Sequence, residues 1–336
     1  MRRSGLAVLA GLMVSLWVAA DSAATSVSQS ALEAFRRPTS IPFPADNPFT
    51  PNKAALGKAL YFEPRLSAGQ NLNCASCHNP SFGWEVPVAG AIGSQNTPLG
   101  RRAPTVLNHA WGEHFFWDGR AATLEEQARG PIEADVEMNM PMAEAVRRLA
   151  AIDGYRNWFD AVFPGEGVTE TTIVQAIATF ERTVVSGRAP FDRWVAGDAD
   201  AVSPAVERGF ALFTGKAGCA GCHTGWNFSD DRFHDIGVPT GDEGRFTVSG
   251  DPRDRFAFKT PSLRDLTLRG PFMHNGMFSD LESILRFYAG GGIDRPSRSA
   301  LIRPFAMSEG ELRDLLAFLE SLTAEAQTVA LPVLPR

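Results

Sequence analysis

Two five-residue segments, Cys74-Ala75-Ser76-Cys77-His78 and Cys219-Ala220-Gly221-Cys222-His223, contain every cysteine of this 336-residue chain. A Cys-x-x-Cys-His segment is typical of covalent haem c attachment, in which the two thiols bond the haem and the histidine binds its iron. One such segment could arise by chance or form half of a zinc site. Two of them, with no cysteine left over, predict two covalent haem c groups whose irons are bound by His78 and His223.

The composition is that of an ordinary globular protein, with 44% hydrophobic and 21% charged residues. The length allows about two domains, and a net charge of −6 gives no reason to expect nucleic acid binding. At the N-terminus two arginines precede an apolar run over residues 6–20, which is shorter than the roughly 20 residues of a membrane-spanning helix. We therefore expect residues 1–24 to be a removed signal peptide, and the mature chain to be periplasmic with no membrane span.

The sequence repeats itself around the two cysteine segments. A glycine-led apolar run precedes each segment, a basic-x-Pro-hydroxyl-apolar run follows it, and a glycine-containing loop comes later. The corresponding pairs are residues 57–62 and 209–213, 102–106 and 259–263, and 116–119 and 273–276. In the last pair Trp117 and His274 occupy the same place. The repeat indicates a duplicated haem domain whose two sites have diverged.

We expect a mainly α-helical fold of two cytochrome c-like domains, each wrapping one haem, with long loops and little β-structure. The predicted domains are residues 45–200 and 201–320, followed by a tail over 321–336 that packs back on the surface. Apolar residues at helical spacing predict helices around residues 173–184, 279–288 and 308–322. Thr123, followed by Glu126, is typical of a capping box that opens a further helix.

The repeat also compares the second ligand position of the two irons. Tyr288 follows His274 at the spacing at which Pro131 follows Trp117. A tyrosine oxygen can bind ferric haem, whereas proline offers no donor. We therefore expect the second iron to be six-coordinate, bound by His223 and Tyr288, and the first iron to be open beside Pro131.

Other side chains compete with Tyr288 for the second iron. Met273, Met277 and Met307 are rival ligands, because histidine and methionine are the usual pair in electron-transfer haems. His274 is a further rival, although it lies where a hydrogen-bonding residue of a haem pocket would lie. Tyr288 could also be a buried tyrosine of the helical stripe. We favour Tyr288 as the ligand.

The repeat and its flanking motifs resemble those of the bacterial di-haem cytochrome c peroxidases, in particular the MauG-like branch. The resemblance runs from about Asn47 to the C-terminus. It rests on Pro104-Thr105-Val106-Leu107-Asn108, Phe116-Trp117-Asp118-Gly119-Arg120-Ala121, Leu124-Glu125-Glu126-Gln127-Ala128 and Gly130-Pro131-Ile132.

The resemblance implies roles for four residues. Trp117 would relay electrons between the haems. Gln127 and Glu137 would line the distal pocket of the first haem, where Glu137 would move a proton between the peroxide oxygens. The second haem takes methionine in ordinary peroxidases and tyrosine in MauG, so Tyr288 places the chain on the MauG side. Without the resemblance, Trp117 would be read as a core residue, Gln127 as a helix surface residue and Glu137 as a solvated carboxylate.

The sequence departs from the family at two places. Ordinary members carry a removable histidine ligand on the first haem, and the matching residue here is Ser94. We therefore expect the first haem to be open already in the oxidised state, although His109 or His114 could swing in. The family also binds calcium between its domains, where this chain has Arg102 and Arg269. Two arginines disfavour a cation there, although backbone carbonyls could still bind one.

The predicted function is reduction of hydrogen peroxide at the first haem, with oxidising equivalents shared through Trp117 with the second. A small c-type cytochrome or a cupredoxin would supply electrons; alternatively, as in MauG, the equivalents would oxidise side chains of a partner protein. A purely electron-transferring di-haem cytochrome is disfavoured, because no second histidine or methionine lies at the matching position of the first haem while Gln127 and Glu137 are present. A sensor that binds a small gas is a third, weaker interpretation. The family often forms homodimers, which leaves a homodimer open for this chain.

Overall fold

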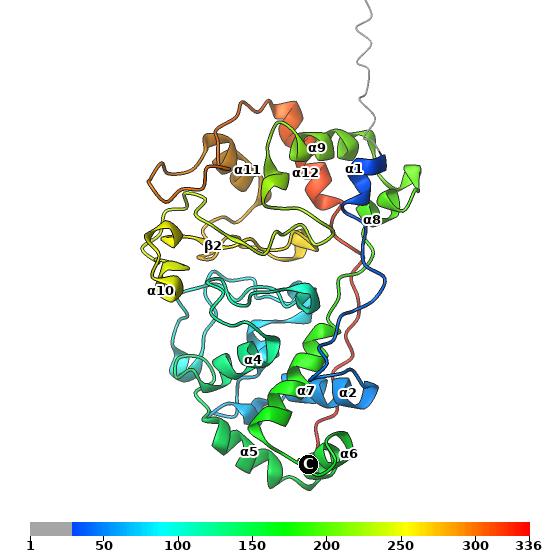
Figure 1. Ribbon diagram of the computed structural model, residues 1–336, viewed down its shortest axis with the longest axis vertical. Helices are drawn as coiled ribbons and strands as arrows, with labels where there is room; N and C mark the ends of the chain where they lie inside the picture. Colours follow the sequence, from blue (N-terminus) through cyan, green and yellow to red (C-terminus); the bar gives the residue numbers. More distant parts are fainter. Residues whose placement is uncertain (1–28) are drawn as a thin grey trace, which may run out of the picture.

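The computed structural model describes residues 29–336, so the predicted signal peptide, 1–24, lies outside the described residues. Within the described part, short helices are joined by long loops. The one sheet there pairs strand β1 (Phe233–His234) antiparallel with β2 (Phe258–Lys259). Two bodies are stacked along the long axis of the molecule (Figure 1). The expected mainly helical fold with little β-structure is confirmed.

The lower body in Figure 1 contains the first cysteine segment. Its helices are α2 (Pro51–Tyr61), α3 (Cys74–Cys77), α4 (Leu124–Glu133), α5 (Met142–Ala150), α6 (Asp153–Val162) and α7 (Glu170–Arg182). Thr169 caps α7 by accepting a hydrogen bond from the N–H of Thr172 (3.1 Å). The apolar stripe that predicted this helix is buried, with Ile173 and Ile177 at most 1% exposed.

The upper body contains the second cysteine segment. Its helices are α8 (Pro190–Val195), α9 (Pro204–Thr214), α10 (Phe246–Ser249), α11 (Leu281–Gly290) and α12 (Glu309–Glu320), together with the N-terminal α1 (Gln29–Glu33). Ser308 and Glu311 form a complete capping box at α12. Helix α11 begins at Leu281 rather than at residue 279, because Asp280 caps it by accepting from the N–H of Ser283 (2.7 Å).

In each body a glycine allows two long helices to cross closely. A Cβ added to Gly57 in α2 would lie 1.8 Å from the carbonyl oxygen of Ala176 in α7. A Cβ added to Gly209 in α9 would lie 2.0 Å from the carbonyl oxygen of Asp314 in α12. These two glycines lead the repeated apolar runs, so the repeat preserves the same helix crossing in both bodies.

Both ends of the described chain pack across the two bodies. Beyond α1, the ring of Phe35 lies against Phe191 and Phe210 in the upper core, with ring centroids 6.1 Å and 5.3 Å away. The C-terminal tail runs down to the lower body (Figure 1). There Arg65 donates to the carbonyl of Pro335 (2.9 Å). The segment after α1 and the C-terminal tail therefore both span the junction, along the same edge of the molecule (Figure 1).

Two loops of the same shape meet where the bodies join. Residues 115–121 and 272–278 are each closed by an antiparallel bridge between their end residues. Their backbones also match in the left-handed region. The matching φ angles are 67° at Phe116 and 69° at Met273, and 66° at both Gly119 and Gly276. The loops that the sequence repeat aligned are therefore alike in conformation.

Each loop is held by the other body. The N–H of Lys259 donates to the carbonyl of Trp117, and the N–H of Arg102 donates to the carbonyl of His274, each at 2.8 Å. The rings of Trp117 and His274 have centroids 6.4 Å apart and an interplanar angle of 72°. The junction is thus built by reciprocal contacts between equivalent residues.

Candidate functional site

The first cysteine segment lines a cavity in the lower body. Asn73 caps α3 by accepting a hydrogen bond from the N–H of Ser76 (3.0 Å), and both thiols of residues 74–78 are free. Gln127 and Pro131 of α4 and Glu137 of the following loop line the same cavity. The structure therefore brings together the side chains that were predicted to surround the first haem.

Helix α4 presents these residues through an interrupted helix. Thr123 caps it by accepting from the N–H of Glu126 (3.1 Å). The Glu126 carboxylate accepts from the N–H of Ala122 instead of that of the cap residue (2.8 Å), so the predicted capping box forms in part. Pro131 lies inside the helix and lacks the N–H that would bind the carbonyl of Gln127.

Glu137 reaches the cavity from a loop that is held in place. Ser94, at the position of the family's removable histidine, donates its N–H to the carbonyl of Glu137 (2.7 Å). Neither His109 nor His114 lines the cavity; within residues 29–336, His78 is the one histidine that does. Burial raises the pKa of the Glu137 carboxyl, and Arg120 opposes that rise.

The second cysteine segment lines a larger cavity in the upper body, together with Tyr288. His223 holds its Nδ1 2.9 Å from the carbonyl oxygen of Phe228, which orients the ring and leaves Nε2 free. Tyr288 lies on α11, whose predicted apolar stripe also lines the cavity. No residue among 29–336 hydrogen bonds to its hydroxyl, and burial raises the pKa of this phenol.

The rival ligands lie in different places. Met273 and His274 line the second cavity along with Tyr288. Met277 is 42% exposed, and Met307 packs against the core of the upper body. Neither of these two lines the cavity.

The residues present fit a covalent haem in each cavity. Each cavity wall offers two free thiols and an adjoining histidine at attachment spacing. Apolar side chains make up most of the rest of both walls. In the second cavity, a phenol without a hydrogen-bond partner adds an oxygen donor of the kind that binds ferric haem.

Trp117 belongs to the lower body but lines the cavity of the upper one. Its Nε1–H donates to the carbonyl of Arg102 (2.7 Å). His274 stacks on Phe258 with a centroid distance of 3.7 Å, and its Nε2 lies 3.2 Å from the hydroxyl of Thr240. Burial lowers the pKa of His274 to about 4, so this imidazole is neutral at pH 7.

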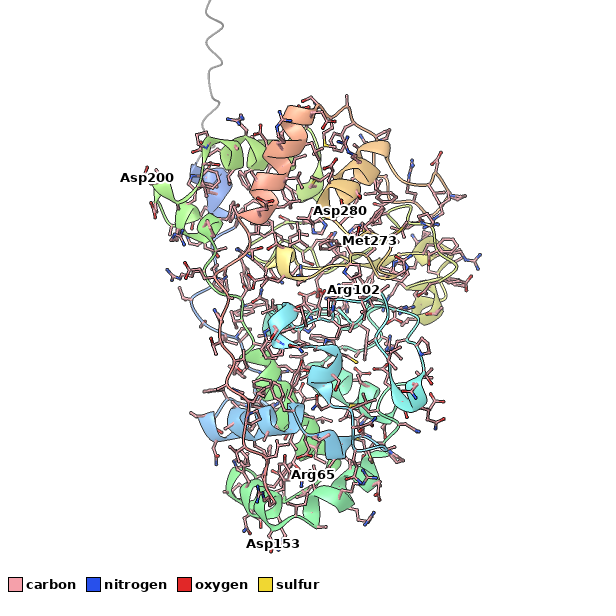
Figure 2. The ribbon with its side chains drawn as sticks, turned by 180° about the vertical axis from the view of Figure 1, so that it is seen from behind. Arg65, Arg102, Asp153, Asp200, Met273 and Asp280 are labelled. Carbon is pink, nitrogen blue, oxygen red and sulfur yellow. The ribbon has the colours of Figure 1, made fainter. Side chains whose placement is uncertain are left out.

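The residues at the family's calcium position do not fit a calcium ion. Arg102 and Arg269 converge on the carboxylate of Glu85, and all three residues are at most 4% exposed. Arg269 also donates to the carbonyl of Ser262. Figure 2 places Arg102 at the junction of the two bodies. Two guanidinium groups around one carboxylate already carry a positive charge, which opposes a divalent cation.

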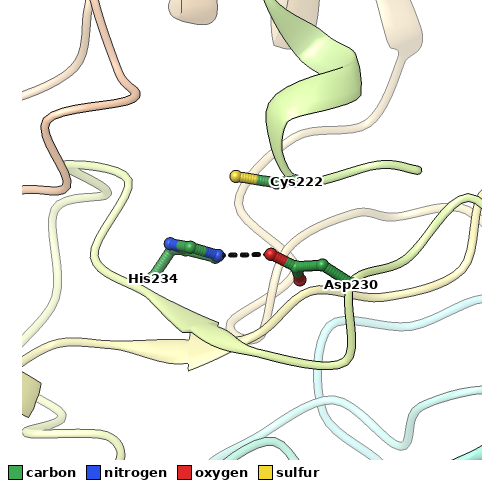
Figure 3. Close-up of side chains that lie close together, drawn as sticks. All are labelled: Cys222, Asp230 and His234. Atoms are coloured by element: carbon green, nitrogen blue, oxygen red, sulfur yellow. Dashed lines mark hydrogen bonds and ion pairs between the residues drawn. The ribbon is translucent and has the colours of Figure 1, made fainter.

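A further group of polar side chains lies beside the second haem attachment point. The His234 Nε2 lies 2.8 Å from an Asp230 oxygen, and Cys222 lies next to both (Figure 3). The hydrogen bond to Asp230, and after it one to Cys222, raise the pKa of His234 to about 9. Because Cys222 is expected to bond the haem, its sulfur is not free to bind a metal ion. We therefore interpret Asp230 and His234 as an ion pair beside the haem.

Glu181 is a cavity residue that the motifs did not identify. It lies on α7 and lines the first cavity. One signal was present in the sequence, because Glu181 follows Ile173 and Ile177 at helical spacing on the apolar stripe of that helix. A charged residue on such a stripe is a candidate for a buried functional group.

Comparisons with known proteins agree with this architecture. Residues 51–200 match the sequence model of the di-haem cytochrome c peroxidases, and residues 206–323 match that of cytochrome c. The chain is 52% identical to the methylamine utilization protein MauG of Methylorubrum extorquens, over 94% of this chain and 92% of that protein. It is 37% identical to the cytochrome c551 peroxidase of Nitrosomonas europaea, over 88% and 86% of the two chains.

A solved structure supports the same relationship. A MauG-like protein associated with microbial copper homeostasis superposes with a TM-score of 0.80 at 32% identity, covering 86% of this chain and 95% of that one. The chain therefore belongs to the di-haem cytochrome c peroxidase and MauG family. This family consists of oxidoreductases whose cofactors are haem c groups, which confirms the expected family and enzyme class.

Proposed function

We propose that the protein reduces hydrogen peroxide at the first haem and shares the resulting oxidising equivalents with the second. The main observation behind this proposal is the contrast between the two cavities. His223 and Tyr288 line one cavity together, whereas the first cavity offers His78 and, at the position that matches Tyr288 in the repeat, Pro131, which has no donor atom. Once bound, the haem irons supply the peroxide-binding position and the redox chemistry.

Two side chains of the first cavity would handle the proton and orient the peroxide. Burial raises the pKa of the Glu137 carboxyl, which makes its carboxylate a stronger base that can take a proton from one peroxide oxygen and return it to the other. The Gln127 amide lines the same cavity and can donate a hydrogen bond to the bound oxygen. Pro131, which lines the same cavity, has no side-chain donor that would compete for the iron.

Trp117 would carry charge between the two cavities. It comes from the lower body, lines the upper cavity and is fixed there through its Nε1–H. A tyrosinate at Tyr288 would stabilise oxidising charge on the second haem more than a methionine would. We therefore propose that the second haem stores oxidising equivalents and is a poor acceptor of electrons from a small cytochrome or cupredoxin.

In this proposal the oxidising equivalents finally oxidise a side chain of a partner protein. Two features favour it over simple peroxide removal: the tyrosine in the second cavity, and 52% identity to a protein named for methylamine utilization. Peroxide removal, with electrons from a small c-type cytochrome or cupredoxin, is the second candidate, favoured by the 37% identical cytochrome c551 peroxidase.

We also propose that the protein works in the periplasm. Covalent haem c is usually assembled outside the cytoplasm, and the N-terminal sequence has the pattern of a signal peptide. Across residues 29–336, the helices are all too short or too polar to cross a membrane.

The test is an EPR spectrum of the oxidised protein, before and after one equivalent of hydrogen peroxide and without reductant. We expect one high-spin and one low-spin haem, both losing signal on peroxide addition. Tyr288→Phe should abolish the shared oxidised state while the first haem still binds peroxide, and Met273→Leu should behave as the wild type. Two low-spin haems that ignore peroxide would contradict the proposal. Loss of the shared state in the methionine variant alone would reassign the ligand.

A further inference from the structure

Glu181 places a carboxyl group without a partner in the first haem cavity. It follows Ile177 by one turn of α7, and both side chains line the cavity. Glu181 is 4% exposed, and its Oε2 has no hydrogen-bond partner among the described residues. Because an ionised carboxylate is costly to bury without a partner, the protonated acid is the favoured form.

The groups around Glu181 do not compensate a negative charge there. Tyr61 of α2 and Cys74 of α3 lie within electrostatic range of the Glu181 carboxylate, and neither side chain carries a positive charge. The neighbouring Arg182 is held by Glu125 of α4 at 2.6 Å, so this cation is already neutralised. Burial, with Glu125 adding to it and Arg182 opposing it, raises the pKa of Glu181 to about 8.

Glu137, the other carboxyl group of this cavity, has a different setting. It comes from the loop after α4 and has Arg120 as a nearby cation. Both carboxyl groups act on the thiol of Cys74, Glu181 more strongly than Glu137, and Glu137 also acts on the thiol of Cys77. Glu181 reaches the cavity from α7 and Glu137 from the loop after α4, so the two carboxyl groups belong to different elements of the fold.

We propose that Glu181 binds a proton when the first haem is reduced and releases it when that haem is oxidised. This inference rests on the proposed placement of the first haem in this cavity. An electron that reaches the iron adds one negative charge to a closed apolar site. Conversion of the Glu181 carboxylate to its acid by one proton from solvent restores the net charge, so one electron and one proton enter together.

The test is a spectroelectrochemical titration of the haem-loaded protein at pH values around 8. We expect the potential of the first haem to fall with pH, by up to about 59 mV per unit for one proton per electron. Glu181→Gln should flatten this dependence, and Glu181→Asp should keep it. Glu170→Gln, which removes a carboxylate with 42% side-chain exposure at the start of the same helix, should leave it unchanged. The two haems are told apart by their spin states.

Three results would overturn the inference: a flat wild-type dependence, a slope that persists in Glu181→Gln, or a slope that is lost only in Glu137→Gln. An infrared spectrum gives an independent check, because the carbonyl stretch of a protonated carboxyl should disappear in Glu181→Gln. If glutamine prevents folding, Glu181→Met supplies a second neutral variant. None of these measurements uses peroxide. Failure here therefore leaves the proposed peroxide reaction standing, and the reverse also holds.

Discussion

Replacing Glu85 with glutamine should strongly destabilise the junction between the two bodies. The carboxylate is 4% exposed and is the shared partner of Arg102 and Arg269, which are 4% and 3% exposed. Glutamine keeps the size and can still accept the hydrogen bond from the N–H of Thr105 (3.0 Å), so the change isolates the charge. Removing one partner of a buried pair costs about 3–5 kcal/mol, against a total stability of roughly 5–15 kcal/mol.

The assay is denaturant unfolding of the haem-loaded protein, with the free energy of unfolding compared between Glu85→Gln and wild type. Glu309→Gln is the matched control, since it removes an exposed partner of Arg286 and should leave the free energy unchanged. Arg102 also holds Trp117 through its carbonyl, so exchange between the haems should weaken in Glu85→Gln. A loss below about 1 kcal/mol, the range of exposed pairs, would refute the argument.

The other predictions concern packing, metal and pH. Gly57→Ala and Gly209→Ala should each lower the melting temperature by several degrees, because a Cβ would overlap a backbone carbonyl. Gly100→Ala is the control, because a Cβ there meets nothing within 4 Å. Prolonged chelation with EDTA should leave both haem spectra unchanged, and a spectral change that calcium reverses would contradict the arginine assignment. Asp230 raises the pKa of His234, so this pair should stabilise the protein fully below pH 6.5 and lose the effect as the pH rises above that value. His234→Asn should therefore flatten the pH dependence of the free energy of unfolding in this range.

Local patterns predicted much of the fold and of both cavities. The cysteine segments and the internal repeat predicted two haem sites. The repeat also predicted that Pro131 lies beside the first site and Tyr288 beside the second, and in the structure they line the first and the second cavity. The pairing of Glu85 with two arginines and the entry of Glu181 into the first cavity were not predicted. The Glu85 pairing joins segments far apart in the sequence and leaves no periodic signal. Glu181 continues the apolar stripe of its helix, but that stripe does not show which cavity the side chain enters. Helix boundaries shifted where a capping residue lies inside the periodic pattern, as at α11, which begins only after Asp280.

The reciprocal hydrogen bonds at the junction give the chain the symmetry of an isologous homodimer. The N–H of Lys259 donates to the carbonyl of Trp117, and the N–H of Arg102 donates to the carbonyl of His274. Equivalent residues make such reciprocal contacts across a twofold axis. The molecule is therefore built as a fused dimer whose two subunits have become unequal. Substitution of one residue of the central ring pair, tryptophan on one side and histidine on the other, breaks that symmetry. The two haem sites thereby become inequivalent.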